Sequence, residues 1–198
     1  DNPNPMGKYF IIGDKAGQYG EALVYLPGNI KPSAASKAKI YNAHGYEPTA
    51  KDKNGKDKLD ENGQPIIALD ARLDYPSKDG TYQVLLPAKN IKLGDEYGNS
   101  VSAGAGGTFS PTSSNGAPKL VTLDQYGNPG TSMNTRSIRA TAALPPGQIN
   151  PDNTINAYSL SYDAEKFAGT DRISLGFTSP GVKPRTVEVT VPPTPKLT

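Results

Sequence analysis

Short runs in which apolar and polar residues alternate recur along the chain and predict an all-β fold. Every second residue is apolar in NAYSLSY, RISLGFT and RTVEVTV, which is the period of a strand with one buried face. The first half has further short runs bounded by Gly, Pro, Asn or Asp: KYFII, ALVYL, KAKIYNA, PIIALDARL and TYQVLLP. Such short strands are typical of a sandwich or a barrel. One helical turn is expected in YDAEKFAG, with Asp163 as its cap and Gly169 as its end.

A segment of small and turn-forming residues, GAGGTFSPTSSNGAP, occupies residues 104–118 and has little to bury. We therefore expect two tandem immunoglobulin-like β-sandwich domains joined by this short Gly/Ser/Pro-rich linker. The first covers residues 1–110 and contains a long Asp/Lys-rich loop at 50–64, and the second covers residues 111–198 and ends in a Pro-rich linker. The pattern leaves open whether residues 1–59 add strands to the first sandwich or form a separate unit.

The Pro-rich ends of the sequence, DNPNP and VPPTPKLT, have no core-forming pattern and are typical of linkers between domains. They predict that the chain is a piece of a longer protein. Its apolar runs are far shorter than the roughly 20 residues of a membrane-spanning helix, so we expect no membrane span. The chain has no cysteine, which excludes disulfides, thiolate metal sites and a cysteine nucleophile.

Charge and catalytic residues argue against two further classes of function. The 21 Lys and Arg nearly balance the 19 Asp and Glu and form no basic block, so we expect no nucleic acid partner. His44 is the single histidine and is expected to lie in an exposed loop. Asp70 and Asp74 would lie about 13 Å apart on a strand, too far for a glycosidase pair. We therefore expect no enzymatic activity.

The acidic loop DKNGKDKLDENG is a candidate calcium site, because its oxygen donors are spaced so that several could converge on one ion. The loop departs from the EF-hand pattern, since Lys56 and Asp57 stand at positions that need an oxygen ligand and a glycine. Interleaved lysines also reduce its negative field, so a solvated hairpin loop is the alternative. The candidate ligands are Asp52, Asn54, Asp57, Asp60 and Glu61.

One turn sequence recurs three times, as DENGQP from Asp60, DEYGNS from Asp95 and DQYGNP from Asp124. In each, the Asp side chain can accept backbone N–H groups a few residues later, and the Gly supplies a positive φ. An ion held by Asp95 and Asp124 at a junction between the two domains is the alternative to a purely structural turn. We expect the structural turn residues to be Asp95, Gly98, Asn99, Asp124, Gly127 and Asn128.

The same turns carry a resemblance to known domains. LDQYGNPG, which follows the strand KLVT, resembles the opening of bacterial immunoglobulin-like (Big-type) domains, in which a D-x-x-G-N-P turn follows the first strand. KDGTYQVLLPAKNIKLGDEYGNSVSAGAGGTFS is similar to the C-terminal half of another bacterial immunoglobulin-like type, with a Tyr-x-Val strand, an apolar turn, D-x-x-G-N and a closing Phe strand. Such domains occur in tandem in surface-layer proteins, adhesins and exported wall-bound enzymes.

The resemblance implies an extracellular location on a bacterial cell surface. We expect a structural, self-assembling or adhesive stalk segment of a larger surface protein, which contacts copies of itself or neighbouring domains of the same chain. The alternative is an accessory module of an exported enzyme that binds carbohydrate or a cell-wall polysaccharide. Neither interpretation requires a cofactor, and calcium in the acidic loop is the one candidate.

Overall fold

The computed structural model of the chain describes residues 34–73, 80–102, 107–130 and 143–193, together with two strands before residue 34. It divides into two units, Asp1–Ser33 and Ala34–Thr198. In the first unit, β1 (Lys8–Ile12) and β2 (Ala22–Leu26) pair antiparallel, with Phe10 opposite Val24. These two strands are the predicted runs KYFII and ALVYL.

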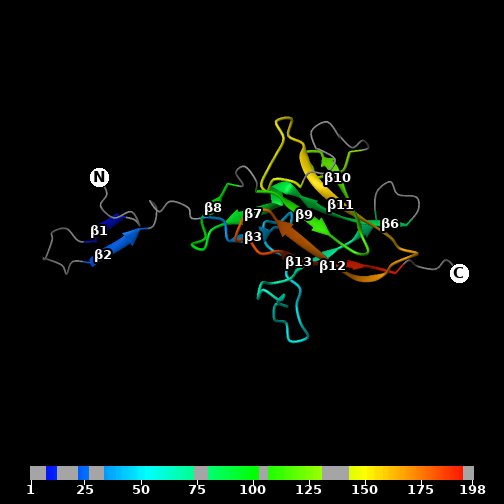
Figure 1. Cartoon of the computed structure of the whole chain (residues 1–198), viewed down its shortest axis with the longest axis horizontal. Coiled ribbons are helices and arrows are strands. Elements are labelled where there is room, and N and C mark those ends of the chain that lie inside the picture. The colour runs from blue at the N-terminus through cyan, green and yellow to red at the C-terminus, as the bar shows by residue number, and fades with distance from the viewer. Residues whose placement is uncertain are drawn as a thin grey trace. The chain divides into compact units, whose positions relative to one another are not determined.

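The second unit contains three sheets (Figure 1). Its strands are β3 (Lys37–Ile40), β4 (Ile67–Asp70), β5 (Arg72–Leu73), β6 (Thr81–Pro87), β7 (Ile91–Gly94), β8 (Ser100–Val101), β9 (Phe109–Thr112), β10 (Ala117–Leu123), β11 (Ile155–Asp163), β12 (Gly169–Phe177) and β13 (Arg185–Val191). Two sheets have four strands, in the orders β10-β11-β6-β5 and β4-β13-β12-β9, and the third has the order β3-β7-β8.

The inner faces of the two four-stranded sheets share one hydrophobic core. Alternate residues of β6, from Tyr82 to Leu86, and of β13, from Val187 to Val191, belong to the same buried cluster as Phe109 of β9. Two buried hydroxyls also join the sheets, because Tyr158 of β11 donates to the Phe109 carbonyl at 3.4 Å and Tyr162 donates to a carboxylate of β12. The prediction of an all-β fold is confirmed, and the packing is compatible with a β-sandwich.

Each four-stranded sheet takes strands from both halves of the sequence, so the expected boundary between residues 110 and 111 is wrong. β6 pairs with β11 over seven residue pairs, β13 pairs in parallel with β4, and β12 pairs with β9. The expected linker is wrong for the described residues 107–118 as well, because Phe109 is fully buried and Pro111 is buried beside it in β9. Alternation identifies a strand but not its partner, and here the partners lie far apart in the sequence.

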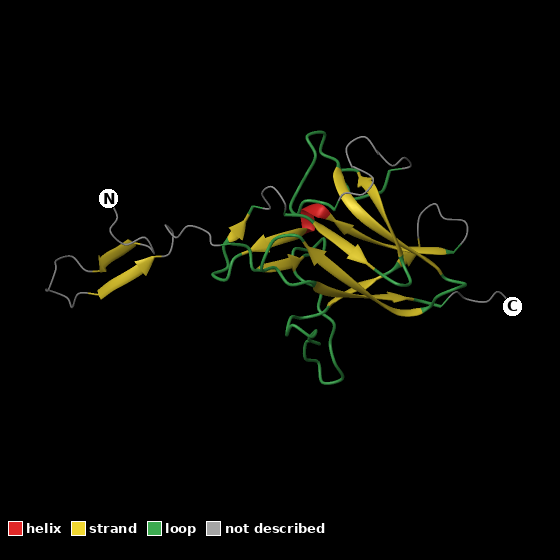
Figure 2. Ribbon diagram, viewed as in Figure 1, coloured by secondary structure: helices red, strands yellow, loops and turns green. Residues whose placement is uncertain are grey.

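Helix is limited to η2 (Ala88–Asn90), a single 3₁₀ turn, within the described residues (Figure 2). The expected helix in YDAEKFAG is one turn that leads from β11 to β12, which lie in different sheets. Asp163 closes this turn, since its carbonyl accepts from the N–H groups of Lys166 and Phe167 at 2.9 Å each. Its side chain accepts from Glu165 N–H at 3.0 Å, and β12 begins at Gly169 before a second turn can form.

Candidate functional site

Six five-residue turns in the described part of the chain share one backbone hydrogen-bond pattern. In each, the first N–H donates to the fifth carbonyl, and the fourth N–H donates to the first carbonyl. The fourth residue has a positive φ, which Gly adopts in five turns and Asn153 adopts in the sixth, with a φ of 65°. The turns begin at Asn42, Asp52, Asp60, Asp95, Asp124 and Asn150.

The first side chain closes the turn in five of the six. Asp124 Oδ1 accepts from the N–H groups of Tyr126 at 2.8 Å and Asn128 at 2.9 Å, and Asp95 Oδ1 makes the matching contacts in its own turn. The Asn128 N–H holds the pKa of Asp124 below its usual value. The structure therefore places the predicted turn residues in the roles expected of them: Asp95, Gly98, Asn99, Asp124, Gly127 and Asn128.

The five candidate calcium ligands do not converge. The Oδ1 atoms of Asp52 and Asp60 face their own turns and accept two backbone N–H groups each. Asp57 accepts from Thr49 Oγ1 at 2.7 Å and from Lys51, and the lysine contact keeps the pKa of Asp57 low. Asn54 and Glu61 are exposed. Among the residues that the structure describes, no three His, Cys, Asp or Glu side chains are grouped so that they could hold a metal.

The residues weighed for catalysis are also dispersed. His44 is the exposed third residue of the turn that begins at Asn42, and its ring stacks near Tyr46 with centroids 6.4 Å apart. Asp70 is exposed at the end of β4, whereas Asp74 lies outside the described residues. None of the described helical segments is long and apolar enough to cross a membrane.

Arg185, the first residue of β13, joins three distant segments of the second unit. Its side chain is 4% exposed, and Nη1 donates to the Ala38 carbonyl of β3 at 2.5 Å and to Glu47 Oε1 at 3.0 Å. Nη2 donates to the Pro65 carbonyl at 2.9 Å, and Glu47 Oε1 also accepts the Ile40 N–H of β3. The arginine thus connects the last strand of the unit to its first strand. No short motif in the sequence marks this residue.

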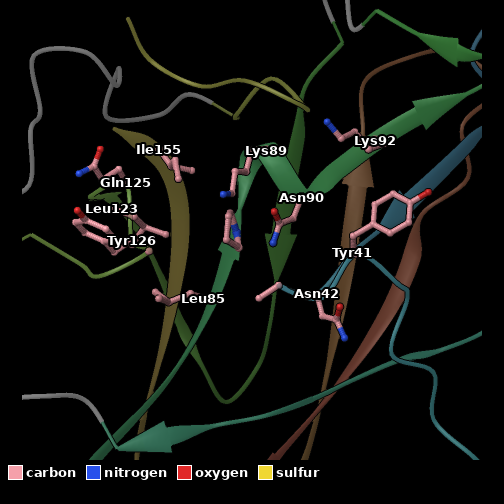
Figure 3. A pocket seen from close by; sticks show the side chains of 14 residues that line it. Tyr41, Asn42, Leu85, Lys89, Asn90, Lys92, Leu123, Gln125, Tyr126 and Ile155 are labelled. Atoms are coloured by element: carbon pink, nitrogen blue, oxygen red, sulfur yellow. The ribbon is translucent and has the colours of Figure 1, made fainter. Parts of the chain in front are cut away.

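A groove of about 600 Å³ lies between two of the repeated turns (Figure 3). The turn that begins at Asn42 forms one wall, and the turn that begins at Asp124 forms the other with Gln125 and Tyr126. The floor is apolar, because the outer face of the β10-β11-β6 sheet carries a second hydrophobic cluster. Its floor residues are Leu85, Pro87, Leu123 and Ile155.

Aromatic, amide and basic side chains surround this floor. Tyr126 is 79% exposed, and Figure 3 places it with Gln125 across the groove from Tyr41, with Lys89 and Asn90 between them. Asn42 and Lys92 complete the far side, and no Asp or Glu is among the described lining residues. An apolar floor with a few amides and cations suits a ligand that has both flat apolar faces and polar or anionic groups. The groove was not visible in the sequence, since its residues come from four separate segments.

No protein-family model matches the chain, and no curated protein matches its sequence.

Proposed function

We propose that the chain is a non-catalytic β-sandwich segment of an extracellular bacterial surface protein, and that its role is to resist mechanical tension along a stalk. The observation that carries this proposal is the position of β13. This strand is the last of the second unit, yet it lies in the centre of its sheet, with seven residue pairs to β12 and four to β4.

The direction of pairing bears on how the strand would resist a pull. β13 runs parallel to β4, with Val187 opposite Ile67 and Thr190 opposite Asp70. A force along β13 would load these hydrogen bonds and those to β12 together, because the bonds lie across the strand. In Figure 1, β3 lies at one end of the second unit and the chain leaves β13 at the other. Tension between these ends would therefore act along β13.

Arg185 supports the same function. Through the Ala38 carbonyl and Glu47 it joins β3, where tension would enter the unit, to β13, where tension would leave it. A charge-assisted contact held in a buried site is among the stronger hydrogen bonds of a fold.

Self-assembly through strand edges has less support. β10 is the longest edge strand of the two four-stranded sheets, but it carries Pro118 and Lys119, which disfavour pairing with another chain. The resemblance of the chain's repeated turns to those of bacterial immunoglobulin-like domains favours a cell-surface location, whether the role is to bear tension or to self-assemble.

Single-molecule force spectroscopy on the full chain tests the proposal. The sequence has no cysteine, so introduced cysteines define where the force is applied. Attachment through Ala34→Cys and Pro193→Cys loads β13 along its length. Attachment through Ala168→Cys and Pro193→Cys instead peels β13 from β12, because the pair Gly169 and Val191 lies at that end of the two strands. We expect a clearly higher unfolding force for the first pair, since forced unfolding reports the barrier along the pulling direction.

Arg185→Met should lower the force measured with the first pair of attachment points. Arg172→Met is the matched control, because Arg172 lies on the exposed side of β12 and makes only a 3.8 Å contact with Glu188. Equal forces for the two pulling directions, or equal effects of the two arginine variants, would contradict a mechanical role.

A further inference from the structure

We propose that the groove between the turns at Asn42 and Asp124, together with the adjoining face of the β3-β7 strands, binds an anionic polysaccharide whose sugars carry carboxylate groups. This proposal does not depend on the mechanical function. It rests on the arrangement of four lysines, two tyrosines and three amide side chains around one continuous surface.

Four lysines supply the positive charge of this surface. Lys37 and Lys39 lie on the exposed face of β3, and Lys39 is directly opposite Lys92 of β7. Like charges directly opposite each other on a sheet destabilise it, so an anion bound here would remove an existing repulsion. Lys89 is the fourth lysine, and it lies in η2 and lines the groove. None of the four forms an ion pair with a residue that the structure describes.

Two carboxylates lie near these lysines. Asp95, which also lines this surface, is 1% exposed, and its side chain accepts the N–H groups of its own turn. The neighbouring Glu96 is exposed in the same turn. Four lysines against these two carboxylates leave the surface with a net positive charge, on a chain whose formal net charge is +2.

The aromatic and amide side chains favour a sugar over a simple anion. Tyr126 is the most exposed large apolar side chain among the described residues, at 79%, and Tyr41 lies opposite it. Tyrosine offers a flat apolar face together with a polar hydroxyl, which matches the apolar face and hydroxyl edge of a pyranose ring. Asn42, Asn90 and Gln125 provide both hydrogen-bond donors and acceptors between the two rings.

The shape favours an extended chain over a small ligand. Tyr41 and Lys92 line the groove and also two adjoining hollows, one along β3 and β7 and the other towards Pro145 and Gln148. The hollows therefore meet at these two residues, and a polymer could contact all of them. Single-stranded nucleic acid is the competing polyanion, and the titration below distinguishes it from the polysaccharide.

Isothermal titration calorimetry with two polymers of one backbone tests the proposal. The anionic probe is polygalacturonate, and the neutral control is the same polymer after full methyl esterification. We expect binding of the first and not of the second, with affinity falling as salt is raised from about 20 mM to 200 mM, because screening shortens the reach of the lysine charges. The double variant Lys39→Gln/Lys92→Gln should bind about tenfold more weakly, as expected for two exposed charges.

Two further variants separate aromatic stacking from charge, and the proposed surface from other exposed lysines. Tyr126→Ala should weaken binding at both salt concentrations, because stacking is not screened. Lys53→Gln/Lys56→Gln is the matched control, since both lysines are exposed in the turn that begins at Asp52 and line none of the hollows described. Each variant is checked by its melting temperature, so a folding defect is not read as lost binding.

The proposal is overturned by any of three results: equal binding of the two polymers, an equal loss in the control double variant, or no binding of polygalacturonate. Tighter binding of a 20-nucleotide poly(dT) than of polygalacturonate would also reject it, in favour of single-stranded nucleic acid. None of these results bears on the mechanical role of β13, which the force measurements test separately.

Discussion

Arg185→Met removes the contacts between the first and last strands of the second unit while retaining much of the side-chain bulk. The variant removes the guanidinium donor from three acceptors: the Ala38 carbonyl, the Pro65 carbonyl and Glu47 Oε1. Loss of one partner of a buried ion pair costs about 3–5 kcal/mol. Glu47 is 22% exposed and keeps the Ile40 N–H, so its charge stays partly solvated. We therefore expect the lower limit, about 3 kcal/mol of unfolding free energy.

Urea unfolding followed by circular dichroism measures this loss. For a unit of this size, about 3 kcal/mol corresponds to a fall in melting temperature of roughly 6–12 °C. Arg172→Met, at a 62% exposed side chain, should cost less than about 0.5 kcal/mol. In a double-mutant cycle with Glu47→Gln, the combined loss should be smaller than the sum of the two single losses, since both remove the same contact. A loss below about 1 kcal/mol for Arg185→Met would refute the reasoning.

Three other outcomes follow from the described contacts. Tyr162 donates to Asp171 at 2.8 Å, and burial first, then this carboxylate, raises its pKa, so the unfolded chain ionises first. The stabilising contribution of the un-ionised Tyr162 is fully present below pH about 10, and the unfolding free energy should fall above it by up to about 1.4 kcal/mol per pH unit. Alkaline denaturation of Tyr162→Phe should show a shallower fall. Gly127→Ala, at a φ of 85° with open space around it, should cost about 1–2 kcal/mol in urea unfolding, whereas Gly127→Asn should cost less. Melting temperatures in EDTA and in millimolar calcium should agree, because the carboxylates of Asp52, Asp57 and Asp60 already accept protein donors; a rise abolished by Asp57→Ala would contradict this.

Strands could be predicted from the sequence because their signal is local. The alternation in RTVEVTV identifies β13, since Val187, Val189 and Val191 all face the core. The same alternation contains no information on which strand lies beside it, so the pairing of β13 with β4 was missed. Phe109 was missed for a related reason, because one aromatic side chain among glycines and serines fills the core without any periodic pattern.

The turns could also be predicted only in part from the sequence. The D-x-x-G sequences at Asp60, Asp95 and Asp124 were recognisable, since the capping side chain and the glycine lie three residues apart. The turn at Asp52 has the same signal and could have been found with it. The turns at Asn42 and Asn150 were harder, because Asn replaces Asp at the first position, and in the second turn Asn153 also replaces the glycine. That two of these turns form the walls of one groove depends on the tertiary fold and has no signature in the sequence.

The central position of β13 also constrains the order in which the chain can fold. In a chain that extends only to the end of β11, β4 and β9 lack the strands beside which they lie in the sheet. β13 is the partner of β4, and β12 is the partner of β9. Contacts between residues as distant as Ile67 and Val187 form slowly, since a long loop must close before they contribute any stability. The sandwich is therefore expected to remain unfolded during synthesis until β13 itself has been made, about 120 residues after the strand that it pairs with in parallel.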